Sequence, residues 1–246
     1  MNLLTLDFGN THAHAALFRS GKQVELGVLA DVDGWLKKYD LTFGDVSGVI
    51  SQVKSYAADM EPLLKQGLLC ERIQDYWKGQ RFAGMPVHYA QSLGEDRLIQ
   101  AWWAFKNIKA PVLVIDAGTF FKIDVITPEG FQGGHILPGL KLLSEDLGQG
   151  EQLREVQFTG IEKNLLTGEA LPHTTADALQ AGAIAYAALI QRLLLRWGIT
   201  QIVISGGDCE RVEAFLRPLA PELPFQRRAD LVHWALLDWY QRNVIG

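Results

Sequence analysis

An internal repeat constrains this chain more than any other feature of its sequence. Leu3–Gly21 reads LLTLDFGNTHAHAALFRSG, and Val112–Gly130 reads VLVIDAGTFFKIDVITPEG. Each segment runs from aliphatic residues through Asp-x-Gly and a hydroxyl residue into an alternating stretch and a closing glycine. Three marks align without a gap: Asp7 with Asp116, Gly9 with Gly118, and Gly21 with Gly130. Repetition of this kind favours a fold built from two similar halves.

Each copy predicts a β-hairpin. A buried strand would carry the Asp to its end, the glycine would let the backbone turn tightly, and a second strand would return. Two unrelated strand–turn–strand units would give a similar pattern, because Asp-x-Gly-Thr is common turn chemistry. The ungapped match of three marks favours duplication over that alternative.

The rest of the chain alternates between helical and extended patterns. Helices are predicted at 31–39, 56–67, Leu93–Lys106, Thr175–Trp197, Val212–Leu216 and Leu231–Asn243, with another helix starting in Gly139–Gly148. Strands are predicted at Val46–Val53 and Gln201–Ser205. Strands followed by helices in both halves indicate α/β layering. The second hairpin begins directly after Lys109–Pro111, so the predicted lobes are 1–110 and 111–246.

Composition narrows the class of protein. With 246 residues, of which 48% are apolar and 21% charged, the chain can bury a sizeable core. Its formal net charge of −5 argues against nucleic-acid and acidic-membrane partners, which select for excess Lys and Arg. Cys70 and Cys209 are too few for a disulfide framework. The first residues, MNLLTLDFGN, do not read as a signal peptide and the apolar stretches are too short for a membrane span, so we expect a cytoplasmic protein.

The repeated Asp-x-Gly turns have the chemistry of a phosphate site. A turn of this kind at a strand end can bind phosphate through backbone N–H groups, and Asp7 could orient a hydrated Mg²⁺. Asp116–Thr119 offers the same groups from the other half, so two such turns facing each other across a cleft would clamp a polyphosphate. Ser205–Asp208 could approach a flat adenine, or be a simple strand-to-helix turn. Each motif is weak alone, and the three in this order favour a nucleotide site.

The ordered set LDFGNT, MPVHYAQSLGEDR, IDAGTFFKID, GGHILPG, TADALQAG and ISGGD resembles the type III pantothenate kinase family of the actin-like ATPase superfamily. The matches run from residue 7 to residue 208. The resemblance implies a duplicated actin-like (ribonuclease H-like) α/β fold, two lobes with a nucleotide cleft between them. It implies phosphoryl transfer from ATP to pantothenate, giving 4'-phosphopantothenate in the first step of coenzyme A biosynthesis. It also implies a homodimer, Mg²⁺, and a monovalent cation, K⁺ or NH₄⁺.

The same resemblance implies roles for individual residues. Asp96 matches the catalytic base, Asp116 a ligand of the monovalent cation, and Thr119 a nucleotide contact. The implied substrate-binding residues are Tyr89, Gly94, Glu95, Asp96, Arg97 and Thr175. The implied first phosphate loop consists of Asp7, Phe8, Gly9, Asn10, Thr11, His12, Ala13 and His14.

The residue chemistry agrees with these roles. Asp96 could accept a proton from a substrate hydroxyl, and Arg97 could pair with a carboxylate such as that of pantothenate. The bland alternative is that Glu95–Arg97 is a helix first turn, where acidic residues suit the macrodipole. His12 and His14 alternate on a strand and lack an evident third ligand, so they fit a site-lining or solvent-facing position better than a metal site.

The second hairpin departs from the family pattern Asp-x-Gly-Thr-Ala-x-Thr-x-Asp. Phe120 stands where that pattern has a small residue, and Lys122 where it has a Thr. We hypothesise that the Lys122 ammonium replaces the monovalent cation, wholly or in part. The alternatives are that Lys122 points to solvent or pairs with Asp124. For the whole chain, the alternatives are a degenerate non-catalytic homologue that binds nucleotide or pantothenate as a regulator, and a kinase for another small hydroxylated acid or sugar.

Overall fold

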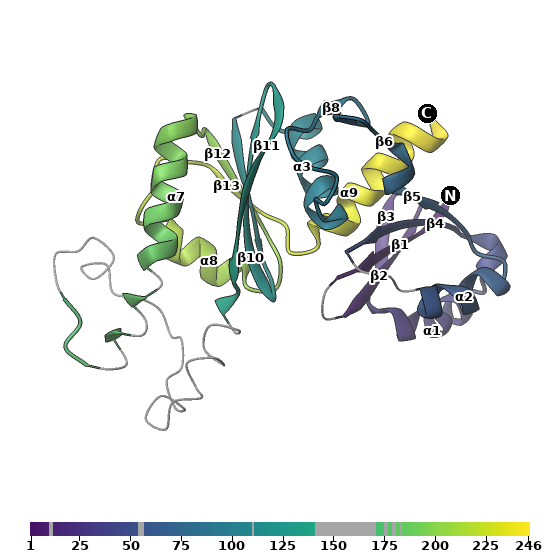
Figure 1. The fold of residues 1–246 in the computed structure, drawn as a ribbon. Coiled ribbons are helices and arrows are strands. Elements are labelled where there is room, and N and C mark those ends of the chain that lie inside the picture. The colour runs from purple at the N-terminus through teal and green to yellow at the C-terminus, as the bar shows by residue number, and fades with distance from the viewer. Residues whose placement is uncertain are drawn as a thin grey trace. The chain divides into compact units, whose positions relative to one another are not determined.

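The computed structural model describes residues 1–9, 12–53, 57–109, 111–140, 171–174, 177–178, 181–182 and 184–246. The chain divides into two compact units, Met1–Asn107 with Asp230–Gly246, and Ile108–Ala229. Each unit is built on a five-stranded sheet flanked by helices (Figure 1). Within the described residues, every helix is too short or too polar to cross a membrane.

The first unit holds a mixed sheet in the order β3-β2-β1-β4-β5. Its strands are β1 (Asn2–Phe8), β2 (Ala13–Arg19), β3 (Lys22–Val28), β4 (Ser47–Gln52) and β5 (Leu69–Arg72). β1, β2 and β3 are antiparallel neighbours, whereas β4 runs parallel to β1 and β5 parallel to β4. A small second sheet contains β6 (Trp77–Lys78), β7 (Arg81–Phe82) and β8 (Met85–Pro86).

The second unit repeats the arrangement of the first. Its strands are β9 (Val112–Ala117), β10 (Phe120–Thr127), β11 (Gly130–Pro138), β12 (Gln201–Ser205) and β13 (Phe225–Arg227). They are ordered β11-β10-β9-β12-β13, with an antiparallel β9–β10–β11 meander and with β12 and β13 parallel to β9. Strand order and strand direction therefore match position by position, and the duplicated α/β fold expected from the repeat is confirmed.

Helices cover both faces of the first sheet. They are α1 (Val32–Lys38), α2 (Ala57–Lys65), α3 (Glu95–Asn107) and α9 (Leu231–Tyr240), with shorter turns at Leu29–Asp31, Phe43–Asp45, Ile73–Tyr76 and Gln241–Ile245. Leu4, Leu6 and Phe8 of β1 share one apolar core with α1 and α2. Because successive strand residues face opposite ways, Thr5 and Asp7 point to the other face. There the Thr5 hydroxyl lies 2.8 Å from Nδ1 of His233 on α9.

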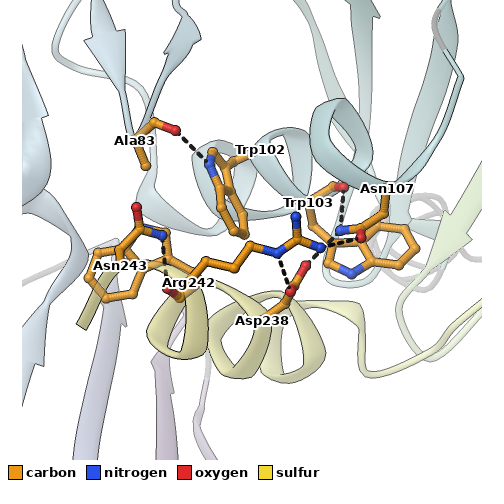
Figure 2. A network of polar contacts seen from close by, with 8 residues as sticks. Ala83, Trp102, Trp103, Asn107, Asp238, Arg242 and Asn243 are labelled. Carbon is orange, nitrogen blue, oxygen red and sulfur yellow. Dashed lines mark hydrogen bonds and ion pairs between the residues drawn. The ribbon is translucent and has the colours of Figure 1, made fainter. Parts of the chain in front are cut away.

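The C-terminal helix is fixed to α3 by a polar network (Figure 2). Asn107 Nδ2 donates to Asp238 Oδ2 over 2.6 Å and to the Trp103 carbonyl over 3.0 Å. Arg242 donates from Nε to Asp238 Oδ1 at 2.6 Å and from a terminal nitrogen to Asn107 Oδ1 at 2.8 Å. Trp102 adds a bond from its indole N–H to the Ala83 carbonyl at 3.1 Å. The last 17 residues, Asp230–Gly246, belong to the first unit.

In the second unit, α7 (Ile184–Trp197) and α8 (Cys209–Leu216) lie on one face of the sheet. Leu113, Ile115 and Ala117 of β9 face them together with Phe121 and Ile123 of β10. The alternation of the strands places the remaining residues, including the functional candidates of this hairpin, on the opposite face.

Most element predictions agree with the structure to within a few residues. The strand at Gln201–Ser205 is found with the predicted bounds, and the helix predicted at Leu93–Lys106 spans Glu95–Asn107. The sequence assigned the last helix to the second lobe, whereas its contacts place it with the first unit, because its apolar residues pack there. The helix start predicted in Gly139–Gly148 lies outside the described residues from position 141 onward.

Candidate substrate and nucleotide site

The first Asp-x-Gly turn follows β1, where the sequence predicted a phosphate loop. Asp7 lies opposite His14 in the β1–β2 register, and Phe8 lies opposite Ala13. The face of β1 that carries Asp7 is the face covered by α3 and α9. Gly9 and His12 flank the turn, and the intervening Asn10 and Thr11 lie outside the described residues. An Asp carboxylate at this strand end therefore shares a sheet face with the helix that begins in the GEDR motif.

The GEDR motif forms the start of α3. Gly94 precedes the helix, and Glu95, Asp96 and Arg97 make its first turn with 6%, 5% and 4% of their surface exposed. A Cβ atom added to Gly94 would lie 2.6 Å from Asp96 Oδ1. The Asp96 carboxylate therefore folds back over the glycine backbone, which only a residue without a side chain allows. The acidic side chains of the first turn also interact favourably with the helix dipole. The structural interpretation of these acids is therefore compatible with the catalytic one.

Tyr89 and Arg97 meet in the structure. The Arg97 guanidinium carbon lies 5.4 Å from the centroid of the Tyr89 ring, within the range of a cation–π contact. Tyr89 is 40% exposed, whereas Arg97 is almost fully buried. The ring thus covers a buried cation next to Asp96, and two of the predicted substrate-binding residues are brought together.

The Glu95 carboxylate accepts a backbone hydrogen bond inside the first unit. The backbone N–H of Gln52, the last residue of β4, donates to Glu95 Oε2 at 3.0 Å. Burial raises the pKa of the Glu95 carboxyl to about 7, against the opposing effects of this bond and of Arg72. Sequence reasoning placed Glu95 only by its position in the motif and gave no sign of this contact.

The second Asp-x-Gly turn carries an internal ion pair. Asp116 lies opposite Lys122 in the β9–β10 register, and Lys122 Nζ donates to Asp116 Oδ2 at 2.8 Å. The two side chains are only 14% and 16% exposed. The alternative of a Lys122 that points to solvent is therefore wrong. Alternation along β10 puts Phe120, Lys122 and Asp124 on the sheet face opposite α7 and α8.

Two glycines from later motifs enclose the Ala117–Thr119 backbone. A Cβ atom on Gly139 would lie 2.2 Å from the Gly118 carbonyl oxygen, and one on Gly206 would lie 2.4 Å from the Ala117 carbonyl oxygen. Gly139 N donates to the Thr119 carbonyl at 3.0 Å, and the amide of Asp208 donates to Ala117 at 3.0 Å. The motifs DAGT, GGHILPG and SGGD thus meet at one turn. The repeated glycines of those motifs are the sequence signal from which this close backbone contact could have been predicted.

The remaining site predictions stay predictions, and they concern His12, His14, Thr175 and ions at Asp7 and Asp116. His12 and His14 lie with ring centroids 6.1 Å apart, and the part of the chain described here contains no group of three or more potential metal ligands. Thr175 lies outside the described residues. Carboxylate oxygens at Asp7 are ligands of the kind that Mg²⁺ prefers, so that strand end fits a hydrated magnesium ion. Asp116, the predicted ligand of a monovalent cation, accepts the Lys122 ammonium group at its Oδ2.

The arrangement can orient a hydroxyl and neutralise anionic groups. Asp96 could accept the proton of a substrate hydroxyl, Arg97 could pair with a carboxylate, and backbone N–H groups of an Asp-x-Gly turn can bind phosphate. Phosphoryl transfer depends mainly on this kind of positioning and charge compensation.

Known proteins of one family match most of this sequence. The family model for type III pantothenate kinase matches residues 3–196. The type III pantothenate kinase of Thermomicrobium roseum is 28% identical in a match covering 98% of this chain and 97% of the relative. The one from Rhodopirellula baltica is 32% identical over 62% of this chain, and the match spans 56% of that relative's length.

Solved structures share the fold. A Campylobacter jejuni protein described as a conserved Baf family transcriptional activator has a TM-score of 0.62 at 20% identity, covering 99% of this chain and all of that one. The activator of the 2-hydroxyisocaproyl-CoA dehydratase from Clostridium difficile, solved with bound ADPNP, has a TM-score of 0.51 at 12% identity, covering 99% and 98%. At these identities, the two structures show the fold alone.

Proposed function

This chain belongs to the type III pantothenate kinase family, and we infer that it phosphorylates pantothenate with ATP, in the first step of coenzyme A biosynthesis. The observation that carries this function at the level of residues is the buried first turn of α3. There Asp96 folds over Gly94, beside Arg97 under the Tyr89 ring. A base and a cation held together in this way suit a substrate that has both a hydroxyl and a carboxylate.

The substrate roles follow from the chemistry of that turn. Asp96 accepts the proton of the primary hydroxyl as the oxygen attacks the γ-phosphate. Arg97 pairs with the pantothenate carboxylate, and Tyr89, which is partly exposed, covers the guanidinium from the solvent side. The glycine at position 94 supplies the space in which the Asp96 carboxylate lies. Thr175 adds a further substrate contact by the family pattern.

The nucleotide roles fall to the two Asp-x-Gly turns. In the first unit, the phosphate loop Asp7–His14 binds phosphate through its backbone, and Asp7 orients Mg²⁺ through its water shell. In the second unit, Thr119 contacts the nucleotide from a turn whose backbone is fixed by Gly139 and Gly206. Bound magnesium would neutralise charge on the transferring phosphoryl group.

The monovalent cation is the point at which this chain departs from its family. Asp116 matches the residue that holds K⁺ or NH₄⁺ in the family pattern, and here it accepts a bond from Lys122. A lysine ammonium is a compact single charge, comparable in this respect to NH₄⁺. Lys122 therefore takes the place of that cation, wholly or in part, while leaving the charge of the turn unchanged.

Assembly and location rest on the family pattern. The chain forms a homodimer, and its small-residue pattern in 178–185 suits the close packing of helices between subunits. The enzyme works in the cytoplasm, where ATP and pantothenate meet. Sedimentation at micromolar protein concentration tests the dimer, and finding only monomers would contradict it.

A coupled assay with ATP, Mg²⁺ and pantothenate tests the function. We expect turnover that is lost when the substrate lacks its primary hydroxyl. The variant Asp96→Asn should keep its fold and its ATP binding while turnover falls by about 10²–10⁴-fold, as expected for loss of a general base. Binding of ATP and pantothenate without turnover in the wild type would favour a non-catalytic homologue, and turnover of another hydroxylated acid would change the substrate assignment.

A further inference from the structure

Glu95 forms a connection inside the first unit that no substrate role explains. Its side chain is 6% exposed, and its Oε2 accepts the Gln52 amide proton over 3.0 Å. Gln52 is the last residue of β4 and lies 43 positions earlier in the sequence. The bond therefore ties the first turn of α3 to the end of a central strand of the sheet.

The next amide along the chain makes a second connection. The backbone N–H of Val53 donates to the carbonyl of Phe8 at 3.0 Å. Phe8 ends β1, and the proposed phosphate loop continues from it. Two consecutive amides, those of Gln52 and Val53, thus hold the substrate turn and the beginning of the phosphate loop. The end of β4 therefore connects the substrate turn to the beginning of the phosphate loop.

The far end of α3 is fixed independently of this connection. Asn107, the last residue of the helix, is bonded to Asp238 and Arg242 of the C-terminal segment (Figure 2). At the near end, the Leu98 amide donates to the Gly94 carbonyl at 3.0 Å, a bond internal to the helix. The Glu95–Gln52 bond joins this end of the helix to the sheet, and it does so next to Asp96.

We propose that Glu95 is a positioning residue for the kinase reaction, holding the Gly94–Arg97 turn against the end of β4 and thereby fixing Asp96 relative to the phosphate loop. The proposal rests on the pantothenate kinase function given above. Above its pKa the Glu95 carboxylate makes a charge-assisted bond to the Gln52 N–H, and below it the neutral carbonyl oxygen can still accept that N–H. Precise placement of a base matters because catalysis falls steeply with small displacements.

The competing role for Glu95 is that of the base itself. Burial raises its pKa to about 7, and a carboxyl of that pKa is suited to proton transfer near neutral pH. The charged groups that act on it are Arg72, which favours the carboxylate, and Asp75 and Asp96, which oppose it. The geometry favours positioning, because the Glu95 carboxylate is directed to a backbone amide of its own unit.

Two substitutions at this position separate the roles. Glu95→Gln keeps an oxygen that can accept the Gln52 N–H, but it cannot act as a base. We therefore expect its kcat to stay within about threefold of wild type, whereas Asp96→Asn loses about 10²–10⁴-fold. Glu95→Ala removes the acceptor and releases the turn that carries Asp96, so its kcat should fall about tenfold or more, with a smaller change in the KM for pantothenate. The exposed acid Glu222, changed to Ala, is the matched control.

Other results would overturn the proposal. A loss of turnover in Glu95→Gln as large as that in Asp96→Asn would make Glu95 a chemical participant. An unchanged kcat in Glu95→Ala would leave Glu95 without a positioning role, including the case in which only the melting temperature falls.

A readout without turnover completes the test. The Gln52 amide resonance, followed by NMR from pH 5 to pH 9, should titrate with the Glu95 carboxyl in the wild type and in Asp96→Asn, and stay constant in Glu95→Gln. If the wild type shows no pantothenate kinase activity, the proposed function fails while this titration still tests the contact. A Gln52 amide resonance with the same chemical shift in the wild type and in Glu95→Ala would overturn the contact itself.

Discussion

Lys122 Nζ lies 2.8 Å from Asp116 Oδ2, across the register of two neighbouring strands that flank the second Asp-x-Gly turn. Both side chains are largely buried, at 14% and 16% exposure. Under the proposed function, this ammonium group takes the place of the dissociable cation, and it is attached to the chain. Its local concentration does not depend on the salt in the medium, and this gives the first prediction.

Activity should be nearly independent of added K⁺ or NH₄⁺ in the wild type and should depend on them in Lys122→Thr. Removing the ammonium leaves the Asp116 carboxylate to bind a cation from solution, as the family pattern implies. The measurement is the initial rate as a function of KCl concentration, with tetramethylammonium chloride holding the ionic strength constant. Lys22→Thr, an exposed lysine on β3, is the control. Strong stimulation of the wild type by K⁺ would contradict the prediction.

Gly94→Ala should lower turnover with little loss of stability. The added Cβ would lie 2.6 Å from Asp96 Oδ1, and a flexible carboxylate end can rotate away at small cost. Asp96 would then leave its position, and the helix would lose a small amount of stability, because Gly94 precedes the first helical residue and Ala caps a helix less well than Gly. Melting temperature and kcat, measured on the same preparation, check both parts. Wild-type kcat in this variant would show that the folded-back Asp96 geometry is not needed.

Tyr89→Phe and Tyr89→Ala should differ in their effect on pantothenate binding. The Phe ring keeps the cation–π contact with Arg97, worth about 0.5–2 kcal/mol, and the Ala variant loses it. We expect KM for pantothenate to rise by about two- to thirtyfold in Tyr89→Ala and to change little in Tyr89→Phe. Equal effects of both substitutions would assign the role of Tyr89 to its hydroxyl instead of its ring.

The repeat carried most of what the sequence could predict about the fold. Three aligned marks predicted two hairpins, and the matching strand order of the two sheets extends that symmetry to all five strands of each. The membership of α9 in the first unit was not predictable, since it depends on long-range contacts such as that between His233 and Thr5. The local sequence pattern predicts which residues are buried, but it does not predict which element of the fold they pack against.

At the candidate site, sequence motifs supplied the residue types and the structure supplied their partners. Asp96, Arg97 and Tyr89 were predicted by pattern, and their proximity follows from the fold. The Glu95–Gln52 bond and the Lys122–Asp116 pair join residues whose contact depends on strand register and helix position. Lys122 was open to three interpretations from sequence because side-chain direction on a strand leaves several partners within reach of a long side chain.

Gly206→Ala should destabilise the second unit, and Gly207→Ala should not. Gly206 has a φ of +87°, and its added Cβ would lie 2.4 Å from the Ala117 carbonyl oxygen, which is rigid backbone. Gly207 has open space at the same atom, so the adjacent position is a matched control. We expect Gly206→Ala to lower the free energy of unfolding by about 1–3 kcal/mol and to weaken ATP binding. A denaturant titration measures the first effect, and a titration with ATP measures the second. Equal stability of the two variants would contradict the close approach to Ala117.

The last prediction concerns pH and the buried His233. Burial lowers the pKa of this imidazole from its ordinary value of about 6.5 to about 3, with a smaller contribution from His14. Between about pH 6.5 and about pH 3, His233 is protonated in the unfolded chain and neutral in the folded chain. The free energy of unfolding therefore rises with pH across this window. His233 therefore costs no stability above pH 6.5, and the free energy of unfolding falls by up to about 1.4 kcal/mol per pH unit below it. Denaturant unfolding at pH 7, 6, 5 and 4.5 should show a wild-type decline that is shallower in His233→Gln and unchanged in His135→Gln, an exposed histidine on β11. If the stability of the wild type and that of His233→Gln fell in parallel with pH, the imidazole would be protonated in the folded state as well.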